Sequence, residues 1–279
     1  MTAPNPGAVG FTYEGVPGLL VVLDDKGVLH LTLDRPDKRN VIDDQMMAAM
    51  IDALDAANRD ERVRVVVLGG TGDHFCGGAD IVARNAPGGD RPRVGSIQRR
   101  VPSMAHRLIP LLLTIQVPVV CGVKGWAAGI GFQLALAADF TIVAKDAHLW
   151  EPFLARGFTP DSGATWLLPR LIGMVKARQL LLLGRQLTGQ EAADWGLVHD
   201  VVRSVNVDAE VELLADQLVE APTVAVGLTK WLLHAGTTAS LTDHLADEAF
   251  ALELSSRSED FREGLTAFQE KRPPDFKGR

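Results

Sequence analysis

The sequence predicts an α/β protein, because short apolar strands alternate with helices and glycines gather where two of the strands end. Hydrophobic residues make up 47% of the 279 residues, which is enough for one large domain, or for one domain with an appendage. We divide the chain into a loose Pro- and Gly-rich tail over residues 1–18, a core over 19–205 and a helical region over 206–279.

The first elements are two strands, a helix and a third strand. Leu19–Leu23 and Val28–Leu33 flank Asp24-Asp-Lys-Gly27, a pattern typical of a hairpin. Apolar residues recur at helical spacing in Met46–Asn58, and the run Val63–Leu68 predicts a buried strand.

The stretch Ala83–Pro102 is rich in Arg, Gly and Pro, and it predicts a loop ahead of a helix near Ser103–Leu113. The same patterns predict strands over Val119–Val123, Phe140–Ala144 and Val198–Val202, and helices over Phe132–Ala138, Thr165–Ile172, Ala209–Glu220, Thr223–Ala235, Leu241–Ser256 and Glu259–Phe268.

Two glycine clusters, each placed directly after a strand, indicate a possible chemistry. One is Gly69-Gly-Thr-Gly-Asp-His-Phe-Cys-Gly-Gly-Ala-Asp80, and the other is Gly125-Trp-Ala-Ala-Gly-Ile-Gly131, which opens a helix. Glycine allows turns with positive φ that leave backbone N–H groups pointing outward. Two such junctions can direct two N–H groups at one oxygen and form an oxyanion hole, although each cluster alone also fits a plain tight turn.

With the phrases around them, these clusters make the chain resemble the crotonase (enoyl-CoA hydratase/isomerase) superfamily. The matching phrases follow the family's order and are Leu33-Asp-Arg-Pro-Asp-Lys-Arg-Asn40, Phe75-Cys-Gly-Gly-Ala-Asp80, Lys124-Gly-Trp-Ala-Ala-Gly129, Ala137-Ala-Asp-Phe140, Gly157-Phe-Thr-Pro-Asp-Ser-Gly163, Leu187-Thr-Gly-Gln-Glu-Ala192, Gly196-Leu-Val198 and Glu270-Lys-Arg-Pro-Pro-Asp-Phe276. The resemblance implies a spiral of ββα turns, an acyl-CoA thioester as substrate, no covalently bound cofactor, and C-terminal helices that assemble a homotrimer or a dimer of trimers.

The resemblance assigns the oxyanion hole to the N–H groups of Ala79 and Ile130, each of which follows a glycine. The family usually has glycine where this chain has Ile130, but the donor is the backbone, so the side chain does not prevent donation. Hydratases of the family use two glutamates, and this chain has Gln133 and Phe153 at those positions. Neither side chain exchanges a proton, so hydration by that route is not expected. Glu151 stands close to Phe153 in the sequence and is interpreted as a polar residue near a turn.

Asp161 is the remaining candidate acid, in the phrase Thr159-Pro-Asp-Ser-Gly163. Some isomerases of the superfamily place a catalytic aspartate at this Pro-Asp position, and aromatic acyl-CoA dehalogenases place a nucleophile there. The alternative is that Asp161 only caps the helix that follows, as aspartate often does.

The resemblance also places the coenzyme A contacts. Lys38 and Arg39 lie where the family passes the nucleotide, Asp80 offers a backbone carbonyl to adenine, and Lys271 reaches a phosphate, sometimes from a neighbouring subunit. We expect Gln133, Phe153 and Trp126 to line the substrate pocket.

Bulk properties narrow the possible partners. The net charge of −7 argues against nucleic acid, and no apolar run is long enough to span a membrane. The N-terminus lacks the regions of a signal peptide, and two cysteines give no disulfide framework, so a cytoplasmic location is expected. The His and Cys spacings predict no metal site.

These observations lead to enoyl-CoA double-bond isomerisation, with Asp161 moving the proton. Two alternatives stay open: a non-catalytic acyl-CoA binding protein, and an Asp161-dependent hydrolase or other reaction on a specialised acyl-CoA.

Overall fold

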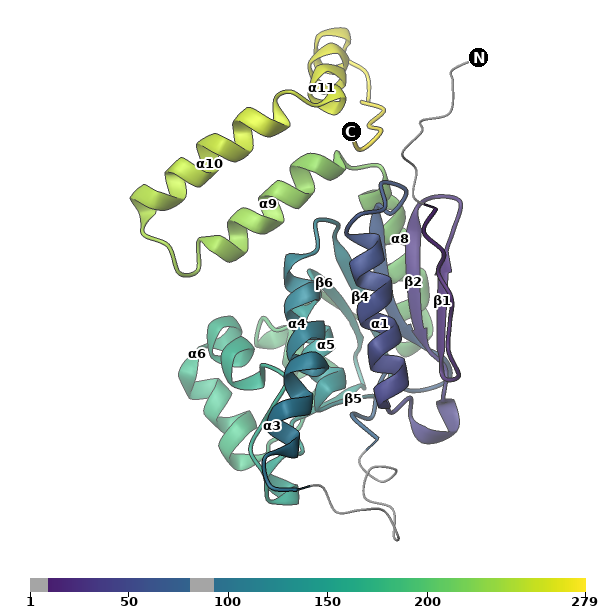
Figure 1. The fold of residues 1–279 in the computed structure, drawn as a ribbon, viewed down its shortest axis with the longest axis vertical. Helices are drawn as coiled ribbons and strands as arrows, with labels where there is room; N and C mark the ends of the chain where they lie inside the picture. The colour runs from purple at the N-terminus through teal and green to yellow at the C-terminus, as the bar shows by residue number, and fades with distance from the viewer. Residues whose placement is uncertain (1–9, 81–92) are drawn as a thin grey trace.

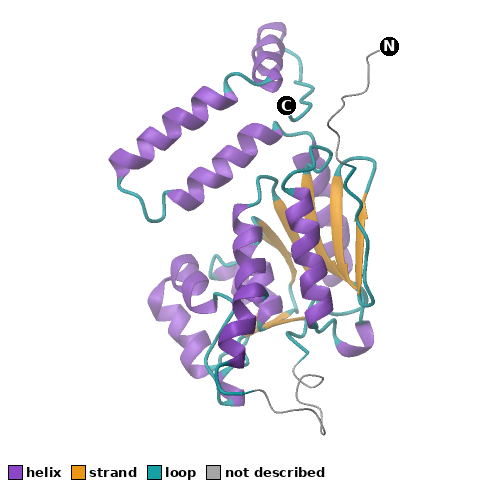
Figure 2. Ribbon diagram, viewed as in Figure 1, coloured by secondary structure: helices purple, strands orange, loops and turns teal. Residues whose placement is uncertain are grey.

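The computed structural model describes residues 10–80 and 93–279, and its centre is a six-stranded sheet (Figures 1 and 2). The strands are β1 (Leu19–Leu23), β2 (Val28–Leu33), β3 (Val65–Gly70), β4 (Val119–Val123), β6 (Phe140–Ala144) and β9 (Asp200–Val202), and they are hydrogen-bonded in the order β1-β2-β3-β4-β6-β9. The β1–β2 pair is antiparallel, as the hairpin pattern predicts, and the other pairs are parallel. Because both faces of this sheet are covered, strands such as Val65–Gly70 are almost continuously apolar.

A second, three-stranded sheet lies at one end of the first and is central to the site (Figure 2). It consists of β5 (Trp126–Ala128), β7 (His148–Trp150) and β8 (Leu187–Thr188). These strands were not predicted, because they are only two or three residues long and show no alternation of apolar and polar residues.

Helices cover both faces of the large sheet. Figure 1 shows α1 (Asp44–Ala57) and α4 (Ala105–Thr114) over one face and α8 (Val207–Val219) behind the other. The Asp43 carboxylate accepts a hydrogen bond from the N–H of Met46 at 2.9 Å and starts α1, whose apolar side chains at helical spacing are buried as predicted.

Further helices complete the body of the protein. These are α3 (Ser96–Arg100), α5 (Ile130–Ala137), α6 (Ala164–Leu183, interrupted at Gly173) and α7 (Gly189–Asp194), with 3₁₀ turns η1 (Pro36–Lys38), η2 (Val101–Ser103), η3 (Leu154–Arg156) and η4 (Ser204–Asn206). The prediction of one loop over Ala83–Pro102 is wrong at Ser96–Arg100, which is helical, and residues 83–92 lie outside the described ranges. The sequence pattern does not reveal this helix, because its last turn is formed by Arg99 and Arg100 and it has no buried apolar face.

The C-terminal helices form an arm that extends from the body (Figure 1). They are α9 (Thr223–Ala235), α10 (Leu241–Ser255) and α11 (Glu259–Glu270), each within two residues of its predicted bounds. The arm is attached through Lys230, whose Nζ lies 2.6 Å from Asp139 and donates to the carbonyl of Leu112 at 2.8 Å. Within the described ranges, no helix is long and apolar enough to cross a membrane.

The predicted loose tail differs from what the structure shows over residues 10–18. Tyr13 donates a hydrogen bond to Asp60 at 3.1 Å, and Arg62 donates to the carbonyl of Phe11 at 2.7 Å, so this stretch is held against the body. Residues 1–9 lie outside the described part of the chain, and the division into core and helical region stays a prediction.

Candidate active site

The first predicted donor, Ala79, lies in a loop that is fixed by backbone hydrogen bonds on both sides. Cys76 pairs with β5 through the carbonyl of Trp126, and Ile42 donates to the carbonyl of Gly78 at 2.8 Å. Gly78 has φ of 108°, which turns the chain so that the N–H of Ala79 takes no part in this pairing. Within the described chain, that N–H donates no hydrogen bond.

The second predicted donor, Ile130, is the first residue of α5, so its N–H has no intrahelical acceptor. Gly129 directly before it has φ of 53° and ψ of −126°, a conformation that favours glycine. The N–H of Gly129 donates to the carbonyl of Trp150 at 3.0 Å, which fixes this turn against β7. The helix dipole adds partial positive charge at the same end of α5.

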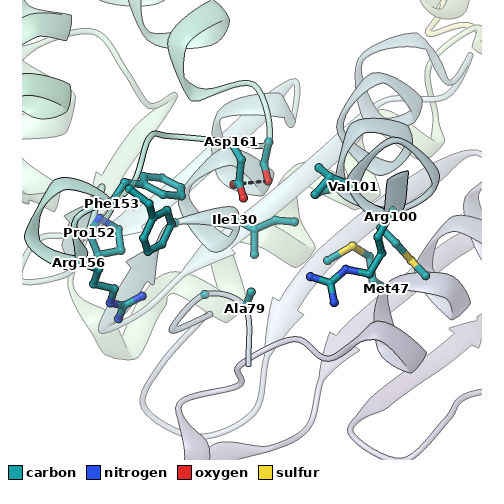
Figure 3. Close-up of a pocket in the computed structure, with 15 residues that line it drawn as sticks. Met47, Ala79, Arg100, Val101, Ile130, Pro152, Phe153, Arg156 and Asp161 are labelled. Carbon is teal, nitrogen blue, oxygen red and sulfur yellow. Dashed lines mark hydrogen bonds between the residues drawn. The ribbon is translucent and has the colours of Figure 1, made fainter. Parts of the chain in front are cut away.

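Both donors open into one pocket, which Figure 3 shows with Ala79 and Asp161 on either side of Ile130. Pro152, Phe153 and Arg156 lie at one end, and Met47, Arg100 and Val101 lie at the other. The structure therefore brings together four predicted site residues, namely Ala79, Ile130, Phe153 and Asp161. Enolate chemistry uses N–H donors for the oxyanion, an acid or base and an apolar wall, and one cavity here is lined by groups of each kind.

Asp161 is exposed at the pocket and does not cap α6. The N-cap residue of α6 is Gly163, and no side chain accepts a hydrogen bond at this helix end. Asp161 instead accepts a hydrogen bond from Ser162 Oγ at 2.8 Å, and Ser162 itself has φ of 53°. The capping interpretation of Asp161 is therefore wrong, because the left-handed turn at Ser162 and Gly163 separates the carboxylate from the first N–H groups of the helix.

The two positions that carry glutamates in hydratases lie in different environments. Phe153 lines the pocket and meets Phe158 edge to face, with ring centroids 5.5 Å apart. Gln133 was predicted to line the pocket but is fully buried beneath it, where its Nε2 lies 2.9 and 2.8 Å from the two carboxyl oxygens of Glu151. Glu151 is only 2% exposed, so its interpretation as a polar residue near a turn is incomplete. Burial, reinforced by the charge of Asp161, raises the pKa of Glu151 well above its ordinary value.

Three predicted coenzyme A contacts lie close to the oxyanion loop. Lys38 and Arg39 are exposed at the end of η1, and the carbonyl of Arg39 accepts from the N–H of Gly77 at 2.7 Å. Asp80 is nearly buried, and one of its carboxyl oxygens lies 3.1 Å from Arg35 Nη2.

Two other predicted residues lie outside this site. Lys271 follows α11, which Figure 1 shows at the opposite end of the molecule from α3, whose Arg100 lines the pocket. Trp126 was predicted to line the pocket, but it stacks on His148 at 4.7 Å and does not border the cavity. Arg100 and Arg156 also border the cavity and were not predicted; Arg100 belongs to an arginine-rich stretch that also fits a solvated loop, and nothing in the sequence around Arg156 marks it. The described residues contain no cluster of three potential metal ligands.

Comparison with known proteins identifies the family. The enoyl-CoA hydratase/isomerase family profile matches residues 24–279. The chain is 39% identical to 1,2-epoxyphenylacetyl-CoA isomerase of Escherichia coli, over 91% of this chain and 97% of that protein. It is 33% identical to crotonyl-CoA hydratase of Syntrophomonas wolfei, over 88% of this chain and 93% of that protein.

The fold agrees with the same family. The crystal structure of an enoyl-CoA hydratase from Bacillus anthracis superposes with a TM-score of 0.86 at 32% identity, covering 94% of this chain and all of the other. The predicted crotonase-like α/β fold with C-terminal helices is thus confirmed. The chain belongs to the enoyl-CoA hydratase/isomerase family of the crotonase superfamily, whose members act on coenzyme A thioesters.

Proposed function

We propose that the protein isomerises a carbon–carbon double bond in an enoyl-CoA thioester, with Asp161 as the proton shuttle. The observation that carries this proposal is that Asp161, which is exposed and does not cap a helix, lines the same pocket as Ala79 and Ile130, whose N–H groups donate no hydrogen bond within the described chain.

In this mechanism, the thioester carbonyl accepts hydrogen bonds from Ala79 and Ile130. Negative charge that develops on this oxygen is stabilised, which lowers the barrier to removing a proton from the neighbouring carbon. Loss of one such donor typically costs about 3–4 kcal/mol of transition-state stabilisation. For a 3-enoyl thioester, the carboxylate of Asp161 removes a proton from C2 and returns it to C4, which leaves a 2-enoyl product.

Hydration is disfavoured by the same residues. The two-glutamate route needs two acids that hold one water. Here Phe153 presents a ring to the pocket, and Gln133 does not line the pocket but is hydrogen-bonded to Glu151. The remaining acid beside them, Glu151, does not border the cavity.

A specialised, ring-bearing acyl group is the second candidate. Phe153 and Phe158 form an edge-to-face pair on the pocket wall, which suits an aromatic or cyclic group. A cavity of about 500 Å³ between α4, α6 and α9 adjoins the pocket at Ala105 and Ser162 and offers further room. The Escherichia coli relative is named for an epoxyphenylacetyl thioester.

Substitution of Asp161 by Asn tests the proposal, because Asn keeps the size and removes the titrating group. Isomerisation of 3-enoyl-CoAs, including ring-bearing ones, should fall by at least about 10²-fold, while acyl-CoA affinity stays within a few-fold. Asp146→Asn, at an exposed position, is the matched control.

An Asp161→Asn variant with an unimpaired isomerisation rate would remove Asp161 from the mechanism. If the wild-type protein also failed to exchange deuterium at C2 or C4, the non-catalytic acyl-CoA binding protein would be the better account. The melting temperature, which should barely change, separates these results from unfolding.

We also infer a homotrimer or a dimer of trimers built on the C-terminal helices. Large apolar side chains on α10 and α11 are exposed in the single chain, among them Leu241, Phe250 and Phe268. In such an assembly Lys271 would reach the coenzyme A of another subunit, and light scattering tests the stoichiometry.

A further inference from the structure

Beneath the pocket, Gln133 and Glu151 form a buried polar pair. Gln133 lies in the first turn of α5, and Glu151 directly follows β7. They are 0% and 2% exposed. No basic side chain forms an ion pair with Glu151 anywhere in the described ranges 10–80 and 93–279. A carboxylate buried without a cation is costly, so such a group usually keeps its proton.

The hydrogen bonds between Gln133 and Glu151 also favour a protonated Glu151. Gln133 Nε2 contacts both oxygens of Glu151, whereas Gln133 Oε1 is buried and has no hydrogen-bond partner among the described residues. A carboxylate has only acceptors and cannot serve that oxygen, but a carboxylic acid has one O–H to donate.

We propose that Glu151 is a neutral carboxylic acid which, paired with Gln133, positions the oxyanion hole. The pair joins α5 to the end of β7, next to the bond from the N–H of Gly129 to the carbonyl of Trp150. Together these links hold the turn that presents the N–H of Ile130 and keep the wall at Phe153 in place. The positioning role rests on the proposed isomerase function, whereas the protonation state does not.

The neutral state also sets the charge of the pocket. Helix α5 carries no titratable side chain, His148 on β7 is exposed, and the charge that acts on Glu151 comes from Asp161. An ionised Glu151 would place a second negative charge near Asp161 and near the developing enolate. A neutral Glu151 leaves Asp161 to act alone as the base.

Infrared difference spectroscopy tests the protonation state without any substrate. The wild-type protein at neutral pH should show the carbonyl stretch of a protonated carboxylic acid, and Glu151→Gln should lose this band. Glu61→Gln, at an exposed position, should keep it. Equal spectra for wild type and Glu151→Gln in this region would overturn the proposal.

Kinetics test the positioning role. Glu151→Gln mimics the neutral acid, so kcat should stay within about 3-fold of wild type, whereas Glu151→Ala should lower kcat by at least about 10-fold with little change in KM. Gln133→Met, of similar volume, should behave like Glu151→Ala if it folds. A loss of 10²-fold or more in a folded Glu151→Gln protein would show that Glu151 transfers a proton, and equal activity of Glu151→Ala and wild type would show that the pair positions nothing. If the wild type isomerises no substrate, the proposed function fails while the infrared result stands.

Discussion

A methyl group added at Gly131 should disturb the oxyanion hole without touching the substrate. Gly131 follows the donor Ile130, and it packs against Cys76 in the loop that carries Ala79. A Cβ at residue 131 would lie 2.6 Å from Cys76 Cβ, 2.7 Å from its carbonyl oxygen and 2.8 Å from its sulfur. Ordinary contact begins near 3.4 Å, so α5 and the loop must separate by about 0.8 Å.

This separation acts on the two donors that must meet one oxygen. A misplacement near 1 Å in a catalytic constellation can reduce the rate by about 10²-fold, similar to the loss of one oxyanion donor. Gly131→Ala should therefore lower kcat for 3-enoyl-CoA isomerisation by about 10²-fold. Overpacking should also reduce the free energy of unfolding by about 1–3 kcal/mol.

Steady-state kinetics and urea unfolding of the same preparation measure both effects. Gly69→Ala is the matched control, because a Cβ at Gly69 would meet nothing within 4 Å and its φ is not positive. A folded Gly131→Ala protein with kcat within about 3-fold of wild type would refute the reasoning, because the two donors would then not depend on this contact.

Two further predictions concern stability. Lys230→Met should lower the free energy of unfolding by about 3–5 kcal/mol, because it leaves Asp139 and the carbonyl of Leu112 without their buried cation; a change below 1 kcal/mol in urea unfolding would contradict this. Burial raises the pKa of Glu151, so the folded state keeps this proton to a higher pH than the unfolded chain does. The resulting stabilisation is complete below the ordinary glutamate pKa and is lost as pH rises through the raised pKa, by up to about 1.4 kcal/mol per pH unit. Between about pH 5 and pH 9, the free energy of unfolding should fall less for Glu151→Gln than for the wild type. The same pH dependence in both proteins would contradict the prediction.

The sequence predicts most of the large sheet because its strands are apolar runs that end at turn residues. The bounds Leu19–Leu23, Val28–Leu33 and Val119–Val123 agree with the structure residue for residue. Glycines predict the two turns before Ala79 and Ile130, since Gly78 and Gly129 adopt the positive φ values for which glycine is suited.

Residues far apart in the sequence account for what the patterns miss. The strand Trp126–Ala128 pairs with Cys76 on one side and with His148–Trp150 on the other, and both partners are remote in the sequence. Gln133 and Glu151 meet 18 residues apart across the second sheet, and no local spacing marks the pair. Asp161 fits the sequence pattern of a helix cap. It does not cap the helix because Ser162 has a positive φ, and a serine in the sequence does not predict that conformation.

The environments of the two carboxyl groups near the pocket divide their roles. Asp161 lies exposed at the pocket surface, where its carboxylate accepts a hydrogen bond from Ser162. Glu151 lies beneath the same pocket, bonded to an amide and shielded from water, where the neutral acid is favoured. Paired acids in unlike surroundings are a common basis for dividing acid and base roles. In the mechanism we propose, Asp161 moves the proton, and Glu151 acts only through the turn that presents the N–H of Ile130.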